Sequence, residues 1–342
     1  MFNPIAVYGD GDGIFWAGEP LRCINFYRKI DYSKLYQCSF IPGKNQLVLT
    51  KGIKRKTVEI HCAINCMHGR YGEDGTLVGM LRLCNIPFVS PDLFASALSI
   101  DKDLTKVVMD GIGVKTAPYV RIKRSDFFKK SQTFIKFVAK RIGFPCIVKP
   151  SRLGSSIGIE KVDNEEKLFG AICQAFNYDD KIICEPYLPN ARDLNCAVYK
   201  VGDKIRLSEI EEAMKKSEIL SFADKYGGGE KAVGCDRRKA VDLPADIVEQ
   251  IKKYCKDVYR KLDFSSIVRF DFLLSNGCVY LNEINAVPGS LAYYLFCNKM
   301  EEFSELITQL VNDAVDVKRK EDNYLTFYSS KILHGDYTGI KK

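Results

Sequence analysis

The sequence predicts a mixed α/β fold, because short apolar runs alternate with stretches of helical periodicity along the chain. In the middle of the chain, extended runs at 117–122, 145–149, 157–162 and 181–185 are interleaved with helices at 101–112, 130–142 and up to about 176. Further on, strands are expected at 194–201 and 205–210, and apolar residues spaced by three and four between 247 and 262 predict another helix. The strands 266–274 and 278–284 then flank a Ser-Asn-Gly turn, which predicts a hairpin, and a last helix covers 303–317.

The composition is that of a globular protein of roughly two to three domains. Among 342 residues, 27% are charged and 46% hydrophobic, and the net charge is +8. Basic residues are interspersed with acidic ones and no nucleic-acid-binding motif occurs, so we expect no nucleic-acid partner. No apolar run reaches the roughly 20 residues that cross a bilayer, and no signal-like segment opens the chain, so we expect no membrane insertion.

Thirteen cysteines are an odd number and cannot all pair. Several lie in apolar stretches without metal-ligand spacing, among them Cys62, Cys66, Cys184 and Cys196. Buried reduced thiols are typical of a reducing compartment, so we expect a cytoplasmic protein.

Four polar residues lie in the middle of the predicted hairpin. Arg269 and Asp271 share one face of the first strand, and Glu283 and Asn285 share one face of the second, because side chains alternate along a strand. Carboxylate and amide oxygens suit Mg²⁺, with phosphate oxygens and water completing its octahedron. The planar fork of Arg269 suits a developing negative charge. The alternative is a salt-bridged surface hairpin, but the apolar residues around these side chains favour the metal site.

The turn of this hairpin decides whether the polar residues can meet. A two-residue turn would pair Asp271 with Asn282 and place Asp271 and Glu283 on opposite faces, which would refute the metal site. A three-residue turn over 275–277 would pair Arg269 with Glu283 and keep the ligands together. We therefore predict the three-residue turn.

A candidate phosphate loop follows the strand at 145–149. Lys149 ends this strand and precedes a Gly- and Ser-rich stretch at 150–158. Such a loop can present backbone N–H groups and an ammonium group to phosphate. The Walker pattern is excluded, because here the lysine precedes the glycines and a strand follows them. An ordinary hairpin loop is the alternative.

Two further motifs give weaker signals. His68 follows the apolar run 58–67, which we expect to be a buried strand of a parallel sheet, and precedes a Gly-rich turn into a helix. Ligands bind at that end of such strands. At 185–188 a strand passes into a linker whose backbone could meet an adenine edge, and Asp193 could bind ribose. A structural histidine and a plain strand end are the alternatives.

Taken together and in this order, the motifs resemble those of ATP-grasp enzymes, and specifically of the D-alanine–D-alanine ligase family. The resemblance extends from about residue 60 to about residue 295, and several separated motifs in the right order make it specific. The matching runs are HGRYGEDG at 68–75, SAL at 96–98 with DK at 101–102, VKP at 148–150 through Gly158, RFD at 269–271, NEIN at 282–285 and PG at 288–289.

The resemblance implies an ATP-grasp fold, with a Rossmann-like substrate lobe at 1–92 followed by two lobes, at 93–188 and 189–342, that sandwich ATP. The implied reaction is ATP-dependent ligation. ATP phosphorylates the carboxylate of a first D-alanine, and the amine of a second attacks the acyl phosphate, giving the dipeptide of peptidoglycan precursors. ATP, two Mg²⁺ ions with Mn²⁺ as a substitute, D-alanine and a homodimeric state are implied with it.

The resemblance also assigns roles to single residues. The phosphate contacts correspond to Lys102, Lys149 and Lys225, with Ser155 and Ser156 in the loop. The adenine and ribose contacts correspond to Glu185, Leu188 and Asp193, and the metal ligands to Asp271, Glu283 and Asn285. Arg269 and the backbone N–H of Gly289 correspond to the oxyanion donors, His68 to a residue near the first substrate, and Tyr226 to a residue near the second, on a loop that closes over the site in the family.

Some positions depart from the family pattern. Tyr293 and Tyr294 stand where the family has small hydroxyl residues against the second substrate's carboxylate, so D-serine stays open as the second substrate. Tyr226 stands where D-lactate-using relatives have a histidine, which favours an amine acceptor. The alternatives are a ligase for another carboxylate and amine, and a nucleotide-binding relative without catalysis.

The start of the chain also departs from the pattern. The family normally begins with a strand, a Gly-Gly loop and a helix whose glutamate holds the ammonium group of the first D-alanine. Residues 4–8 and 10–15 resemble the segment after that element, so roughly 25 to 35 residues of the pattern are unmatched. Glu19 is a poor substitute for the glutamate, because it would lie on the wrong side of the sheet. We expect a truncated ligase, and the alternative is a relative with an incomplete first-substrate site.

Overall fold

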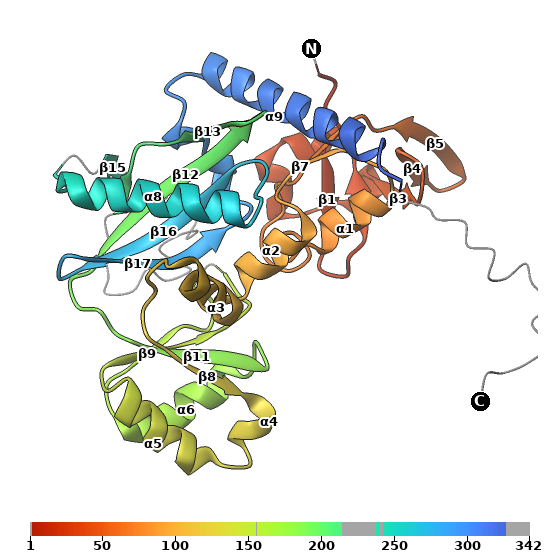
Figure 1. The fold of residues 1–342 in the computed structure, drawn as a ribbon. Helices are drawn as coiled ribbons and strands as arrows, with labels where there is room; N and C mark the ends of the chain where they lie inside the picture. Colours follow the sequence, from red (N-terminus) through yellow and green to blue (C-terminus); the bar gives the residue numbers. More distant parts are fainter. Residues whose placement is uncertain (1, 155, 214–236, 240–241, 326–342) are drawn as a thin grey trace, which may run out of the picture.

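The computed structural model describes residues 2–154, 156–213, 237–239 and 242–325, and it confirms the mixed α/β fold. Three parts follow one another along the chain (Figure 1). They are built on a five-stranded sheet, a four-stranded sheet and a six-stranded sheet. Helix α3 (Lys102–Ile112) lies where the central and C-terminal parts meet.

The N-terminal part contains an antiparallel sheet with its strands in sequence order. Its first two strands form a hairpin in which Val7 pairs with Ala17. The elements are β1 (Val7–Gly9), β2 (Phe15–Ala17), β3 (Tyr36–Ile41), β4 (Gln46–Lys51) and β5 (Lys54–Glu59), with the short helices η1 (Glu19–Arg22), η2 (Ile24–Arg28) and η3 (Tyr32–Lys34) between β2 and β3. In the described residues of this part, parallel pairing is confined to β6 (Ala63–Ile64) and β7 (Phe88–Val89).

The single buried strand expected over 58–67 is wrong. Within the part of the chain that the structure describes, strand β5 ends at Glu59, pairs with β4 alone and is exposed along most of its length. The chain then leaves the sheet, and β6 begins only at Ala63. The basic cluster at 54–56 suits an exposed edge strand, and the apolar run continues through the bend that follows it. Hydrophobic periodicity cannot detect such a bend inside an apolar run.

Three helices follow, and the sequence predicted where the first and the third begin but did not predict the second. They are α1 (Thr76–Leu83), α2 (Leu93–Ile100) and α3. Asp101 caps α3 by accepting a hydrogen bond from the backbone N–H of Leu104 (3.3 Å), and the helix ends at Gly113 in the left-handed region (φ 83°). Because the cap fixes the start of α3, Lys102 is placed on its first turn.

The central part is a four-stranded antiparallel sheet in the order β10-β9-β11-β8, with helices packed on it (Figure 1). Its buried core joins apolar side chains of the sheet, such as Val148 and Ile182, to Leu168 and Ile172 of α6. The elements are β8 (Val120–Lys123), α4 (Arg124–Phe127), α5 (Ser131–Arg141), β9 (Cys146–Pro150), β10 (Glu160–Val162), α6 (Glu165–Ala175) and β11 (Lys181–Pro186). The predicted order of strands and helices is confirmed here.

The C-terminal part is a six-stranded sheet in the order β15-β14-β12-β16-β17, with β13 beside β12. Helix α8 packs on it through the face predicted from spacing, with Ile251 and Val258 fully buried. Helix α9 lies against both this part and β7, and Leu306 and Leu310 fill that contact. The elements are β12 (Arg192–Val201), β13 (Lys204–Leu207), β14 (Glu211–Ala213), β15 (Arg237–Lys239), α8 (Ala245–Lys261), β16 (Val268–Ser275), β17 (Cys278–Asn285), η4 (Gly289–Leu295) and α9 (Met300–Glu321).

The three-residue turn predicted for the β16–β17 hairpin is wrong, and so is the predicted pairing of Arg269 with Glu283. Ser275 pairs with Cys278, so the turn contains two residues. A β-bulge on β17 then shifts the register by one residue, and Asp271 lies opposite Glu283. The two carboxylates therefore share a face even though the turn is short. Because of the bulge, the two-residue turn does not refute the metal site.

Among the helices of the described residues, none is both long and apolar enough to cross a membrane.

Replacing Asp101 with alanine is expected to lower the free energy of unfolding by about 2–4 kcal/mol. The change removes the cap of α3, a hydrogen bond from Ser151 Oγ (2.8 Å) and a buried ion pair with Lys181 (2.7 Å). Denaturant unfolding measures the loss. Asn164 caps the exposed start of α6 without an ion pair, so Asn164→Ala should cost only about 1 kcal/mol. Equal losses in the two variants would show that the ion pair contributes nothing.

Candidate active site

A cavity of about 560 Å³ lies where side chains of the three parts meet. Every predicted site residue that the structure describes lines this cavity. They are His68, Lys102, Lys149, Ser156, Glu185, Leu188, Asp193, Arg269, Asp271, Glu283, Asn285 and Gly289. Ser155, Lys225 and Tyr226 lie outside the described residues. Residues that are up to 221 positions apart in the chain, His68 and Gly289, thus line one cavity.

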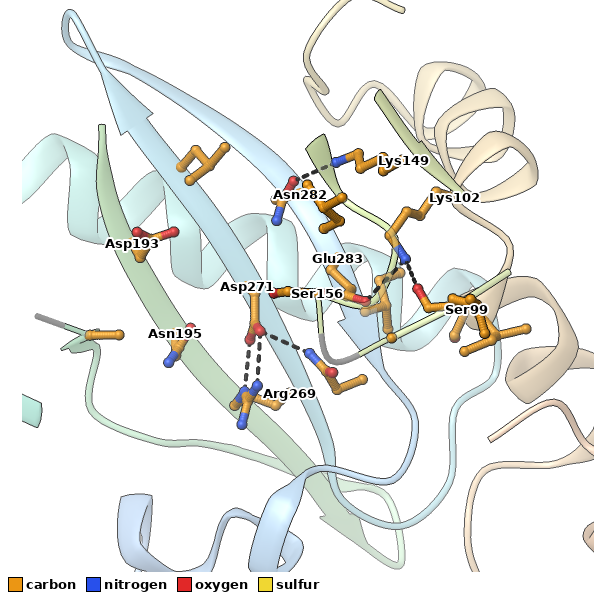
Figure 2. A pocket seen from close by; sticks show the side chains of 18 of the residues that line it. Ser99, Lys102, Lys149, Ser156, Asp193, Asn195, Arg269, Asp271, Asn282 and Glu283 are labelled. Carbon is orange, nitrogen blue, oxygen red and sulfur yellow. Dashed lines mark hydrogen bonds and ion pairs between the residues drawn. The ribbon is translucent and has the colours of Figure 1, made fainter. Parts of the chain in front are cut away.

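The β16–β17 hairpin supplies the polar floor of the cavity (Figure 2). The guanidinium of Arg269 donates to both carboxylate oxygens of Asp271, from Nε to Oδ1 (2.7 Å) and from Nη2 to Oδ2 (2.9 Å). Nδ2 of Asn285 also donates to Asp271 Oδ2 (2.9 Å). Burial alone would lower the pKa of Arg269, but the adjacent Asp271 raises it above its ordinary value. Arg269 therefore stays charged beside the carboxylate.

The bulge at Asn282 has a consequence for this floor. In a regular strand two consecutive side chains point to opposite faces. Here both Asn282 and Glu283 line the cavity, because the extra residue of the bulge turns one of them. Asn282 Oδ1 accepts a hydrogen bond from Lys149 Nζ (3.3 Å), and Glu283 Oε1 lies 3.2 Å from Lys102 Nζ (Figure 2).

The side chains of Asp271, Glu283 and Asn285 suit a divalent cation. Asp271 and Glu283 provide carboxylate oxygens on directly paired positions, and Asn285 can turn an amide oxygen toward them. No group of three or more His, Cys, Asp or Glu side chains in the described parts of the chain could hold a metal by itself. Two carboxylates and an amide are instead the partial oxygen set that Mg²⁺ uses when phosphate oxygens and water supply the rest.

Two lysines from different elements form the cationic wall. Lys102, on the first turn of α3, donates to the backbone carbonyl of Leu153 and thereby ties the helix to the Gly- and Ser-rich loop. Lys149, on β9, points into the same space. Both side chains are nearly buried, at 6% exposure each, so the two charges are poorly screened by water. An anionic group such as a phosphate would be attracted strongly to this wall.

Glu185, at the end of β11, lies buried between two ammonium groups. Lys149 pairs with its Oε2, and Lys106 Nζ lies 2.5 Å from its Oε1. Burial alone would raise the pKa of Glu185, but Lys149 and Lys106 lower it to about 2. The carboxylate is therefore ionised at neutral pH and can only accept hydrogen bonds.

The loop that carries His68 is fixed by its own side chains. The carboxylate of Glu73 accepts a hydrogen bond from the N–H of Gly69 (2.7 Å), and the buried side chain of Asn65 donates to the carbonyl of Gly72 (2.8 Å). Glycine is required at position 72, because a Cβ there would lie 2.2 Å from a backbone oxygen. The loop thus holds His68 in the lining of the cavity, with Nδ1 of its ring 3.8 Å from Glu73 Oε1.

Sequence reasoning missed three residues of the site or its support. Asn195 and Asn282 line the cavity, and Lys106 stands directly behind Glu185. Lys106 carries a signal that could have been used, since it follows Lys102 by four residues and so shares its side of α3. Asn282 lies in the NEIN run that resembles the family, but its residue type does not predict its orientation, which depends on the bulge.

Comparison with known proteins places this fold among ATP-grasp ligases. The solved D-alanine–D-alanine ligase of Helicobacter pylori superposes with a TM-score of 0.72 at 30% identity, over 90% of this chain and 88% of that one. The D-Ala:D-Ser ligase of Enterococcus faecalis superposes with a TM-score of 0.73 at 24% identity, over 92% and 89% of the two chains, and shows the fold alone.

Sequence comparison identifies the family. The family described as D-ala D-ala ligase C-terminus matches residues 108–313. The D-alanine–D-alanine ligase of Thermosipho melanesiensis is 32% identical over 97% of this chain and 89% of its own length. That of Campylobacter jejuni is 35% identical over 87% and 83% of the two chains. The chain belongs to the D-alanine–D-alanine ligase family.

Proposed function

We propose that this protein is an ATP-dependent D-alanine–D-alanine ligase that forms the dipeptide of peptidoglycan precursors. The observation that carries the proposal is one cavity that joins a lysine wall, a carboxylate floor and the guanidinium of Arg269. The lysines suit phosphates and the carboxylates suit a divalent cation. Arg269 suits the oxyanion of acyl transfer. Membership of the family supplies the substrates.

In the first step, a carboxylate oxygen of the first D-alanine attacks the γ-phosphorus of ATP, and the bond to the bridging oxygen breaks, so that ADP leaves. Lys102 and Lys149 hold the phosphates and neutralise the charge that develops on them. The Gly- and Ser-rich loop, tied to Lys102 at Leu153, covers the same phosphates. Asp271, Glu283 and Asn285 would hold Mg²⁺, which supplies charge neutralisation at the phosphate oxygens.

In the second step, the neutral amine of the second D-alanine attacks the acyl carbon. The tetrahedral intermediate collapses with loss of inorganic phosphate, and the amine nitrogen releases a proton. Arg269 and the backbone N–H of Gly289 donate hydrogen bonds to the oxyanion. Asp271 keeps the guanidinium oriented through two hydrogen bonds, so Arg269 needs no rearrangement during the reaction.

The nucleoside end of ATP would lie against the linker between the central and C-terminal parts. Glu185, ionised at neutral pH, would accept a hydrogen bond from the exocyclic amino group of adenine. Leu188 offers its backbone to the base, and Asp193 offers a carboxylate to the ribose hydroxyls. The homodimeric state and the cytoplasmic location expected from the sequence stay predictions.

An ADP-release assay with single amino and hydroxy acids tests the proposal. We expect release that depends on ATP, Mg²⁺ and D-alanine, with the dipeptide identified by mass spectrometry, and no release with L-alanine. Tyr226 favours an amine acceptor, so D-lactate added as the second substrate should give less product than D-alanine near neutral pH. Release that depends on a different acid and amine would replace the proposed substrates, and no release with any pair would refute ligation.

The same assay decides between D-alanine and D-serine as the second substrate. Tyr294 lines the cavity with its hydroxyl 3.4 Å from Arg269 Nη1, and Tyr293 lies beside it. Two bulky phenols leave less room than small hydroxyl residues, which favours the smaller side chain of D-alanine. A preference for D-serine in direct competition would overturn this assignment.

A further inference from the structure

Lys106 is a buried lysine whose charge no step of the reaction uses. It lies on α3, one turn after Lys102, and is 3% exposed. Lys106 does not line the cavity, whereas its partner Glu185 does. Its ammonium group meets three acceptors: Glu185 Oε1 (2.5 Å), the backbone oxygen of Ala117 (3.1 Å) and the ring face of Tyr119 (5.5 Å to the centroid).

The two oxygens of Glu185 face different partners. Oε1 contacts Lys106, which does not line the cavity, and Oε2 contacts Lys149, which lines the cavity and also contacts Asn282. A phosphate that binds Lys149 competes with Oε2 for its ammonium group. Lys106 is buried and does not line the cavity, so a phosphate there does not compete for its ammonium group. Lys106 therefore stays beside Oε1 as the cation that holds Glu185 ionised, and Oε2 is left on the side of Lys149 and the cavity.

From this geometry we propose that Lys106 is a positioning residue that sets the preference for the nucleobase. The inference rests on the proposed function, in which Glu185 faces the base of ATP. An ionised carboxylate only accepts hydrogen bonds, so it favours a base with an exocyclic amino group and disfavours one with an oxo group at the same position. Without the charge of Lys106, a buried Glu185 would take up a proton or turn away, and the distinction would weaken.

The test compares ATP with inosine triphosphate, which carries an oxo group in place of the amino group. We expect the unaltered protein to prefer ATP by roughly 10²-fold or more in kcat/KM. In Lys106→Met this preference should fall about tenfold or more. The loss should appear in the KM for ATP and leave kcat at saturating ATP nearly unchanged, since Lys106 touches no reacting group. An unchanged preference in a folded Lys106→Met protein would overturn the inference.

A double-mutant cycle with Glu185 separates positioning from a merely structural role. If Lys106 acts through Glu185, adding Lys106→Met to a Glu185→Gln protein should not change the ATP-to-inosine preference further. The double variant removes both charges of the pair, so it should fold even if Lys106→Met alone does not. Additive losses of preference in the cycle would contradict the proposal.

Lys181 provides a matched control in the same part of the chain. It is also a largely buried lysine paired with carboxylates, 2.7 Å from Asp101 and 3.0 Å from Asp103, but it does not line the cavity. Lys181→Met should lower thermal stability and leave the nucleotide preference unchanged. A similar loss of preference in this variant would show a general effect of a destabilised core.

Calorimetric binding of ADP and inosine diphosphate distinguishes failure of the inference from failure of the proposed function. The protein could bind ADP about tenfold or more tightly than inosine diphosphate and yet not ligate D-alanine. In that case the ligase assignment fails, and the double-mutant cycle of Lys106 and Glu185 is measured on the two dissociation constants instead of on kcat/KM. If ligation occurs and the two nucleotides bind equally, the inference alone fails. Binding of neither nucleotide overturns both.

Discussion

Replacing Arg269 with lysine is expected to lower kcat for dipeptide formation by roughly 10²–10³-fold. Lysine keeps the positive charge but lacks the planar guanidinium. The guanidinium donates to both oxygens of Asp271 and has a further N–H group for the oxyanion. The interaction with the oxyanion exists only in the second step. The KM for ATP should therefore change little, because the phosphates lie against Lys102 and Lys149.

Single-turnover kinetics with ATP and D-alanine measure this effect on each step separately. Arg192→Lys is the matched control, because Arg192 makes the same two-pronged contact with Glu212 (2.9 and 2.8 Å) but does not line the cavity. It should keep nearly full kcat. If Arg269→Lys lowered thermal stability and kcat only to the extent that Arg192→Lys does, Arg269 would be a structural residue and not an oxyanion donor.

The helices of the central and C-terminal parts were predictable from the sequence, because most of them are long and periodic. Helix α8 has apolar residues at every third or fourth position, and the caps of α3 are set by Asp101 and Gly113. The N-terminal part was predicted less well. Its apolar run at 58–67 contains the end of an edge strand, then a bend, then a two-residue strand. Residue types alone do not show where one of these ends and the next begins.

The candidate site was predictable as a set of residues, but the path that brings them together was not. The residue types of the β16–β17 hairpin predicted that Asp271 and Glu283 share one face, and the two residues lie opposite each other. The metal site itself stays a prediction. The predicted reason was a three-residue turn, whereas the observed reason is a bulge at Asn282. The bulge goes with a contact between Asn282 and Lys149, which are 133 positions apart in the chain, and residue types alone do not predict such a contact.

Among substitutions of the proposed metal ligands, we expect the largest loss of activity when Glu283 is replaced. Glu283→Gln keeps the size of the side chain but removes its charge, so we expect activity at about millimolar Mg²⁺ to fall on the order of 10²-fold or more. The Mg²⁺ concentration for half-maximal activity should rise, because a neutral amide binds the cation more weakly than a carboxylate. Glu321→Gln is the control, since Glu321 also forms an ion pair at 3.2 Å, with Arg82, remote from the cavity.

Glu283 also forms an ion pair with Lys102, and loss of that ion pair could by itself lower the activity of Glu283→Gln. A second variant separates this effect from loss of a metal ligand. Lys102→Met breaks the same contact from the other side. If Glu283 served only to hold Lys102, the two variants would lose activity alike and neither would change the half-maximal Mg²⁺ concentration. If Glu283 holds the cation, only Glu283→Gln raises that concentration. Lys102→Met instead raises the KM for ATP, because the phosphates lose a cation while the oxygen ligands of the metal stay in place.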